Sequence, residues 1–285
     1  MVTIFSIPKP FKGHIDIIQR NAIQSWLALS PKCTVILFGD EIGLAEVAKE
    51  FDILHIKEIK KNKYGTPLLS SAFDLAQKLA KTPILTYINA DIILLSDFIS
   101  GIQKINKDSF LMCGRRWNFD IKEKIDFIDI YWESKLYERV IKEGELRTFS
   151  GIDYFVFPVN LQYNLPQFAV GRLGWDTWLL YYTRTLKIPI IDATKVITVI
   201  HQNHDYLNYL YGGRGKITRL EDKENIKLTS NYSDMLTLRE ADWVLTDNGL
   251  EKPRISRRVF SALSSFYVWR KILSIRRKIK KLYNL

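Results

Sequence analysis

The chain of 285 residues is 47% hydrophobic and 26% charged, which is the composition of a globular protein and excludes a fibrous or intrinsically disordered chain. Its net charge of +11 is confined to one end: residues 252–285 hold eleven Lys and Arg and no acidic residue, whereas residues 1–251 hold 31 basic and 31 acidic residues. A neutral body argues against nucleic acid as a partner, and no stretch approaches the roughly 20 apolar residues of a membrane-spanning helix.

Short apolar runs alternate with amphipathic segments over the first half of the chain. Predicted strands cover residues 2–7, 34–38, 53–56, 84–88 and 110–114, and predicted helices cover residues 15–29, 44–51, 68–81 and 98–105. This alternation indicates right-handed β-α-β units, so we expect an α/β fold with a mainly parallel central sheet. The N-terminus lacks a basic region followed by an apolar signal segment, which favours a cytoplasmic protein.

The stretch around Asp91 is the first candidate site. A buried strand over residues 84–88 follows Pro83, and Asn89, Ala90 and Asp91 come at its carboxyl end, where ligands of open α/β sheets bind. A carboxylate beside the amide oxygen of Asn89 suits Mn²⁺ or Mg²⁺ that takes its other ligands from phosphate. An Asp that caps a turn through its own backbone is the alternative.

Two basic segments are candidate phosphate sites. Residues 60–67 form a Lys-rich loop that contains Tyr64 and Gly65 and precedes a helix, and the free N–H groups of a helix start favour anions. Arg115 ends the strand over residues 110–114, and its planar guanidinium matches phosphate oxygens. For the loop, the alternative is that its lysines are simply solvated. For Arg115, the alternative is a surface ion pair with the acidic segment over residues 120–145, which we expect to be a helical insertion.

Carboxylates and a histidine follow in the second half of the chain. Asp176 comes after two glycines at the start of a predicted helix, where it serves either as an N-cap or as a catalytic base. Asp153 lies in the segment over residues 149–158, which is predicted to be a strand introduced by a polar turn. A late strand over residues 196–200 is followed by His201, and His204 lies three residues later; imidazole is an acceptable ligand for Mn²⁺, which makes His201 a candidate ligand opposite Asp91.

Residues 251–285 have the pattern of a basic amphipathic helix. Apolar residues recur at steps of three or four from Ile255 to Leu282, and basic residues occupy the rest of the helix surface. This pattern predicts a helix that lies in the interface of an anionic membrane, which would place the protein peripherally on the inner face of the plasma membrane. Packing of the apolar stripe on the body of the protein is the alternative.

Taken together, Asn89-Ala90-Asp91 after a buried strand, the glycine-flanked Asp176 and the strand-end His201 resemble the glycosyltransferase A fold of nucleotide-sugar-dependent transferases, of the bacterial polysaccharide type. The resemblance rests on order and spacing and covers about residues 1–250. It implies one Rossmann-like nucleotide-diphospho-sugar transferase domain, followed by the helical tail at residues 251–285.

The resemblance also implies roles for individual residues. Asp91 and His201 would hold Mn²⁺ or Mg²⁺ against the diphosphate of a nucleotide-sugar donor, and Asp176 would activate a hydroxyl of a glycan or lipid-linked glycan acceptor with inversion. Asp153 is a rival catalytic carboxylate that suits a retaining geometry. Asn89 stands where the family motif has its first acidic residue, so one carboxylate carries the metal. The implied nucleoside and donor contacts are Ser6, Ile7, Pro8, Asp40, Asn89 and Ala90.

Two other functions fit parts of the pattern. A sugar nucleotidyltransferase would share the sheet and the metal, but it usually has a glycine-rich basic loop after the first strand, where this chain has residues 7–11 without glycine. A non-enzymatic adaptor that binds membrane or nucleic acid through the basic tail is the second, and it predicts salt-sensitive binding to nucleic acid.

Overall fold

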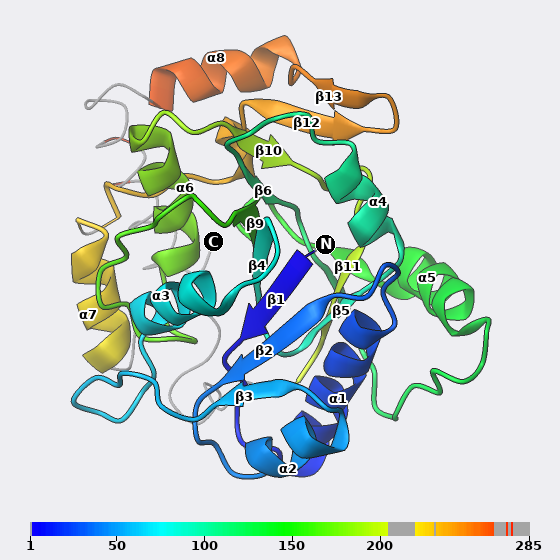
Figure 1. Cartoon of the computed structure of the whole chain (residues 1–285). Helices are drawn as coiled ribbons and strands as arrows, with labels where there is room; N and C mark the ends of the chain where they lie inside the picture. The colour runs from blue at the N-terminus through cyan, green and yellow to red at the C-terminus, as the bar shows by residue number, and fades with distance from the viewer. Residues whose placement is uncertain (1, 205–219, 231, 265–271, 273–274, 276–285) are drawn as a thin grey trace.

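The computed structural model describes residues 2–204, 220–230, 232–264, 272 and 275 (Figure 1). A nine-stranded sheet has the order β13-β12-β10-β6-β9-β4-β1-β2-β3, and a four-stranded sheet has the order β5-β11-β7-β8. Five of the eight pairings in the large sheet are parallel. The predicted α/β class and the mainly parallel central sheet are therefore confirmed.

The elements have the following bounds. The strands of the large sheet are β1 (Val2–Ser6), β2 (Thr34–Phe38), β3 (Leu54–Ile56), β4 (Ile84–Ile88), β6 (Leu111–Cys113), β9 (Tyr154–Pro158), β10 (Ile190–Asp192), β12 (Trp243–Thr246) and β13 (Gly249–Glu251). Those of the small sheet are β5 (Ile92–Leu94), β7 (Trp117–Phe119), β8 (Glu145–Leu146) and β11 (Val199–Gln202). The helices are α1 (Gly13–Leu27), α2 (Leu44–Glu50), α3 (Leu69–Leu79), α4 (Asp97–Gln103), α5 (Trp132–Glu143), α6 (Trp175–Thr185), α7 (Leu220–Leu228) and α8 (Ile255–Ser264).

Helices cover both faces of the large sheet because successive side chains of a buried strand point to opposite faces. In β1, Ile4 packs in a cluster with residues of α1, α2 and α4, whereas the next residue, Phe5, packs with residues of α3 and α6. Figure 1 shows α3 and α6 on one side of the sheet and α1 and α4 on the other. The apolar runs that predicted the strands are thus buried on both faces.

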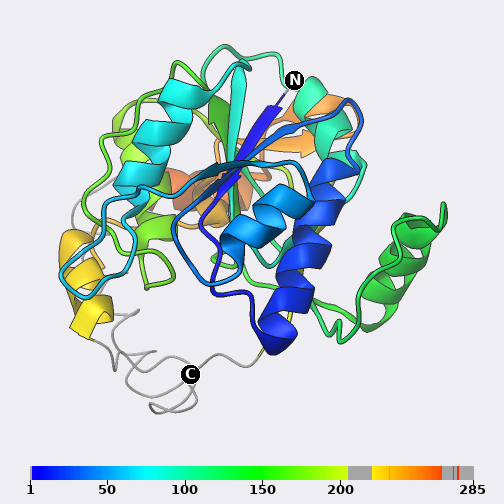
Figure 2. The same cartoon turned by 60° about the horizontal axis from the view of Figure 1, so that its bottom comes forward.

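The small sheet was predicted only in part. The strand predicted to end at residue 200 includes His201 and continues to Gln202, and the short strands β5, β7 and β8 were not predicted. The acidic segment predicted as a helical insertion over residues 120–145 is helical only in α5. Figure 2 shows α5 at the edge of the molecule, apart from the helices that cover the large sheet.

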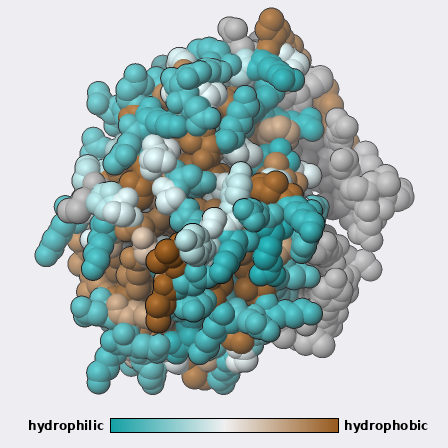
Figure 3. Space-filling model, turned by 90° about the vertical axis from the view of Figure 1, so that its right-hand side faces the viewer, coloured by the Kyte–Doolittle hydropathy of each residue, from teal (hydrophilic) through white to brown (hydrophobic). Residues whose placement is uncertain are grey.

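The face that carries α5 exposes apolar side chains. Ile128 and Ile130, in the segment before α5, are 91% and 83% exposed. Figure 3 shows apolar atoms among polar ones on this face. None of the helices in the described parts of the chain has the length and hydropathy needed to span a membrane.

The predicted domain boundary after residue 250 falls inside β13. Of the predicted helical tail, α8 is helical, and residues 265–271, 273–274 and 276–285 lie outside the described residues.

Candidate functional site

The backbone of Asp91 is fixed at the carboxyl end of β4. The amide N–H of Ile92 donates to the carbonyl of Asn89 at 3.2 Å, which closes a tight turn between β4 and β5. The carbonyl of Asp91 accepts hydrogen bonds from the backbone N–H and the side-chain Nε2 of Gln202, each at 3.2 Å. Because Gln202 is fully buried and also donates to the carbonyl of Ile18 at 2.7 Å, Asp91 cannot shift without breaking buried hydrogen bonds.

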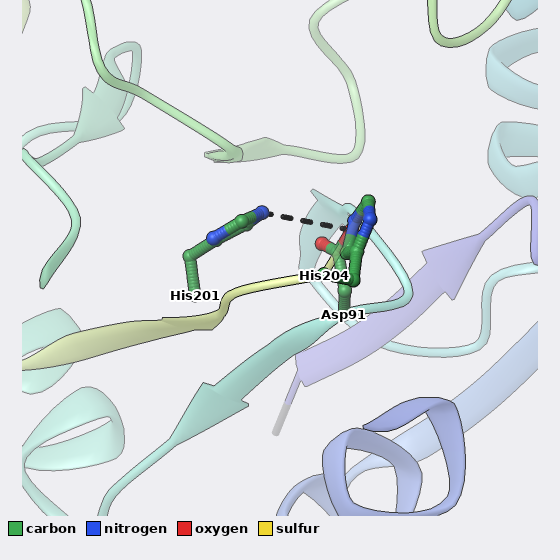
Figure 4. Close-up of side chains that lie close together, drawn as sticks. All are labelled: Asp91, His201 and His204. Carbon is green, nitrogen blue, oxygen red and sulfur yellow. Dashed lines mark hydrogen bonds and ion pairs between the residues drawn. The ribbon is translucent and has the colours of Figure 1, made fainter. Parts of the chain in front are cut away.

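Strand register brings two histidines to Asp91. In the antiparallel pair of β5 and β11, His201 lies opposite Ile92, the residue directly after Asp91. The Nε2 atom of His201 lies 3.8 Å from Asp91 Oδ2, and the Nε2 atom of His204 lies 3.0 Å from the same oxygen. One ligand atom from each of the three residues lies within 4.8 Å of the others, and Figure 4 shows the three side chains gathered at one point.

The protonation states of this cluster suit a cation. Burial lowers the pKa of His201 to about 4, so its imidazole is neutral at pH 7 and can bind a metal ion. Burial alone would raise the pKa of Asp91, but His201, His204 and Lys9 together hold it well below its usual range. The carboxylate is therefore charged, and its buried Oδ1 accepts no hydrogen bond from any described residue.

These donors fit a divalent ion. A carboxylate oxygen and two imidazole nitrogens can share one ion, and imidazole suits Mn²⁺ better than Mg²⁺, which prefers oxygen ligands. The buried Oδ1 of Asp91 offers a further acceptor to an ion or to a water bound to it. Asp91, His201 and His204 could thus hold Mn²⁺ with positions left for other ligands.

Lys9 adds a positive charge at the edge of the cluster. Its Nζ lies 3.7 Å from Asp91 Oδ2 and 3.3 Å from the Nε2 atom of His204, and its side chain is 51% exposed. A flexible ammonium group at this position can balance the charge of Asp91 and can also contact a phosphate.

Asn89, the other polar residue of the motif, faces a second carboxylate instead of Asp91. Its Nδ2 donates to Asp153 Oδ1 at 2.7 Å, and its Oδ1 accepts from the hydroxyl of Tyr87 at 3.3 Å. The other oxygen of Asp153 forms an ion pair with the guanidinium of Arg116. Both oxygens of the buried Asp153 are therefore engaged.

Asp176 is the second residue of α6, near the same end of the sheet. Trp175 before it packs edge-on against Tyr87 of β4, with ring centroids 5.1 Å apart, and Gly174 supplies the left-handed backbone (φ 97°) that starts the helix. One oxygen of Asp176 accepts from the N–H of Thr177 at 2.8 Å. Burial, and then the charge of Asp153, raise the pKa of Asp176 to about 6.

The metal cluster and the carboxylate at α6 belong to one electrostatic neighbourhood. The charges of Arg116 and Asp153 act on the pKa of His201 and also on that of Asp176. The interaction of two charges weakens with the distance between them, so His201 and Asp176 both lie near the Arg116–Asp153 ion pair. The structure therefore brings the three principal predicted residues, Asp91, His201 and Asp176, to the same region of the carboxyl edge.

The predicted nucleoside contacts at the end of β1 are mostly buried. Ser6 donates from Oγ to the carbonyl of Ile88 at 2.6 Å, which ties the end of β1 to the end of β4. Ile7 and Pro8 are buried beside it. Asp40, at the end of β2, is exposed and forms an ion pair with Lys61 that lowers its pKa.

The other predicted donor contacts lie at different places along the edge. The hydroxyl of Tyr64 donates to Glu224 of α7 at 3.1 Å, and Gly65 takes a left-handed conformation in the turn (φ 82°). Ala90 is buried between Asn89 and Asp91. The guanidinium of Arg115 lies over the ring of Phe149 and donates to the carbonyls of Arg147 and Leu146.

Lys9 and Arg116 were not among the predicted metal and donor ligands, and the sequence left open whether Asn89 or His204 contacts the metal. The three-residue spacing of His201 and His204 was the available signal for the third ligand. Nothing in the sequence near Lys9 indicated a contact with Asp91, because the contact joins segments 82 residues apart.

No protein-family profile and no curated protein sequence matches the chain. Among solved structures it resembles a protein from Desulfovibrio desulfuricans G20 described as a nucleotide-diphospho-sugar transferase, at 9% identity and a TM-score of 0.41 over 80% of this chain and 95% of that one. It also resembles glucosyl-3-phosphoglycerate synthase from Mycobacterium tuberculosis in complex with Mg²⁺ and uridine diphosphate, at 14% identity and a TM-score of 0.45 over 81% and 78% of the two chains.

A further likeness is to residues 1–349 of TarS from S. aureus in complex with UDP-GlcNAc, at 9% identity and a TM-score of 0.47 over 80% of this chain and 65% of that one. These similarities concern the general arrangement of helices and strands. The functional assignment rests on the geometry of the site itself.

Proposed function

We propose that this chain is a glycosyltransferase that moves a sugar from a nucleotide-diphosphate donor to a hydroxyl group of a glycan or lipid-linked glycan. The observation that carries the proposal is the convergence of Asp91, His201 and His204 within 4.8 Å at the carboxyl end of β4, in the same neighbourhood as the raised-pKa carboxylate of Asp176. A cation site can stabilise the leaving diphosphate and a carboxylate base can activate the acceptor hydroxyl, which are two functions that inverting sugar transfer uses.

Asp91, His201 and His204 would hold the ion, and Mn²⁺ suits this set better than Mg²⁺ because two of the three ligands are imidazoles. When bound, the ion supplies positive charge that stabilises the diphosphate as it leaves. Gln202 holds the backbone of Asp91 in place through two hydrogen bonds to its carbonyl. Lys9 contributes a second positive charge on the exposed side of the cluster.

Asp176 is the proposed base. A pKa of about 6 leaves its carboxylate ionised at pH 7 yet basic enough to take a proton from an acceptor hydroxyl as that oxygen attacks the anomeric carbon. Attack from the side opposite the leaving diphosphate inverts the configuration. Arg116 and Asn89 engage both oxygens of Asp153. This supports a role for Asp153 in positioning its neighbours and argues against its acting as a nucleophile.

The tail is the proposed membrane contact. Ile255, Val259 and Leu263 are spaced four residues apart along α8 and are 76%, 54% and 39% exposed, so this stripe is open to solvent to a large part in the described structure. An exposed apolar stripe, in a tail whose sequence holds eleven basic residues and no acidic one, fits an anionic membrane on the cytoplasmic side, where lipid-linked acceptors would be reached.

The transfer reaction tests the proposal. Donor-dependent release of nucleoside diphosphate should be measured with UDP-, GDP- and dTDP-sugars in the presence of Mn²⁺, and the anomeric configuration of the product should be determined by NMR. The proposal predicts metal-dependent release from one donor class and an inverted product. Equal release by Asp176→Asn and by the unmodified chain would refute the role of the base.

A further inference from the structure

Three arginines surround the ring of Phe149, outside the cluster around Asp91. The Cζ atoms of Arg115, Arg257 and Arg239 lie 5.0, 5.1 and 5.3 Å from the centroid of this one ring. They come from three separate parts of the chain: the connection between β6 and β7, the helix α8, and the 3-10 turn η2 (Leu238–Glu240). A half-buried aromatic ring thus gathers three guanidinium groups in one small region.

The cluster carries more positive than negative charge. Asp192 pairs with Arg257 at 3.0 Å, and its side chain is only 5% exposed. The N–H groups of Arg115 donate to backbone carbonyls, which are neutral. Arg239 is exposed and forms no ion pair with any described carboxylate. One carboxylate therefore faces three guanidinium groups.

The like charges act on one another. Burial lowers the pKa of Arg115, and the nearby charge of Arg257 lowers it further, although Asp192 opposes both effects. With Asp192 as the carboxylate that faces three guanidinium groups, the cluster can accept a further anion, and the planar forks of guanidinium groups match the oxygens of phosphate. A phosphate monoester carries a charge of about −1.5 to −2 at pH 7, which balances the excess.

We infer that Arg115, Arg239 and Arg257, held around Phe149, form a binding site for a phosphate group that is separate from the diphosphate site at Asp91. The neighbouring Arg116 pairs with Asp153 and is not a member of this cluster. A phosphate bound there would belong to the acceptor or to a lipid headgroup.

The orientation of α8 determines how an acceptor phosphate or a lipid headgroup could reach the cluster. Arg257 points inward to Asp192 and Phe149, whereas Ile255 and Val259 of the same helix are exposed. If α8 lies on a membrane through Ile255 and Val259, Arg257 faces away from the lipid, so a lipid headgroup would reach the cluster through the exposed Arg239. The existence of the site does not depend on glycosyl transfer; only its assignment to an acceptor rests on the proposed function.

The test compares two exposed arginines that each lie over a phenylalanine ring. Arg239→Gln removes one member of the cluster, and Arg139→Gln is the matched control, since Arg139 lies 5.2 Å over Phe119 on a different face. Thermal unfolding of the full chain should be followed with inorganic phosphate and with sodium chloride at equal ionic strength. We expect phosphate to raise the midpoint of the unmodified chain and of Arg139→Gln, and the rise to shrink at least by half in Arg239→Gln.

Two further arms identify the source of the phosphate and separate this site from the metal site. If the ligand is a lipid headgroup, flotation with vesicles that contain phosphatidic acid should weaken more in Arg239→Gln than in Arg139→Gln. If the two variants float equally and Arg239→Gln has lost the phosphate response, the site binds a soluble or acceptor phosphate. Asp91→Ala should lose metal-dependent nucleotide binding but keep the phosphate response. The inference is overturned if phosphate stabilises no more than chloride does, or if Arg239→Gln and Arg139→Gln respond equally in both assays.

Discussion

Replacement of Asp176 by Asn should make the folded protein more stable at pH 7 while it removes the proposed base. Burial and the negative charge of Asp153 raise the pKa of Asp176 from 3.8 to about 6. Between these two values the folded chain binds the proton more tightly than the unfolded chain, so stability falls as pH rises through this window. Above about pH 6 the carboxylate is ionised in both states, and the whole free-energy cost of burying its charge is subtracted from the stability of the fold.

The magnitude follows from the shift. A difference of about two pKa units corresponds to about 3 kcal/mol of unfolding free energy, and the partial exposure of Asp176 reduces this to about 1–3 kcal/mol. The substitute amide oxygen can still accept the hydrogen bond from the N–H of Thr177. The stabilisation should therefore appear at pH 7 and vanish near pH 4, where the carboxyl group of the unmodified chain is protonated.

The assay is urea unfolding followed by tryptophan fluorescence at both pH values. Asp40→Asn is the matched control, because Asp40 is exposed and its ion pair with Lys61 lowers its pKa, so this change should not stabilise the fold at pH 7. The reasoning is refuted if Asp176→Asn destabilises the fold at pH 7, or if its effect is the same at pH 7 and pH 4.

Three other outcomes are expected. His204→Ala removes one of the three metal ligands and should weaken Mn²⁺ binding at least about tenfold in calorimetry. His55→Ala, in β3, is the control and should leave Mn²⁺ binding unchanged, so equal losses in the two variants would contradict the ligand set. Lys9→Met removes a competing cation from Asp91 and should strengthen Mn²⁺ binding about two- to fivefold, as expected for a partly exposed ion pair; no change would mean that Lys9 does not compete for the site. Val259→Asp should reduce sedimentation with anionic vesicles, and unchanged sedimentation would count against the membrane contact.

The sequence predicted the strands β1, β2 and β4 of the large sheet well because these strands are long enough to show a pattern. β1, β2 and β4 each have five residues with an apolar run, and their position before amphipathic helices indicated the parallel order. Asp91 could be placed at a strand end for the same reason. The strands β5 and β7 have three residues each and follow β4 and β6 without an intervening helix, so the alternation of strands and helices did not indicate them.

The direction of individual side chains could not be predicted. Arg115 and Arg116 are neighbours in the sequence, yet Arg115 faces Phe149 and Arg116 faces Asp153. Asn89 lies two residues before Asp91 but bonds to Asp153. These choices depend on tertiary partners, and no local pattern identifies such partners.

The account depends most directly on the binding of a divalent ion by Asp91 and its two histidines. Calorimetric titration of Mn²⁺ into the full chain, with and without UDP, GDP or dTDP, measures this binding. The account predicts one Mn²⁺ per chain, tighter binding in the presence of one of the nucleotides, and loss of both in Asp91→Ala. Equal Mn²⁺ and nucleotide affinities in Asp91→Ala and in the unmodified chain would contradict it.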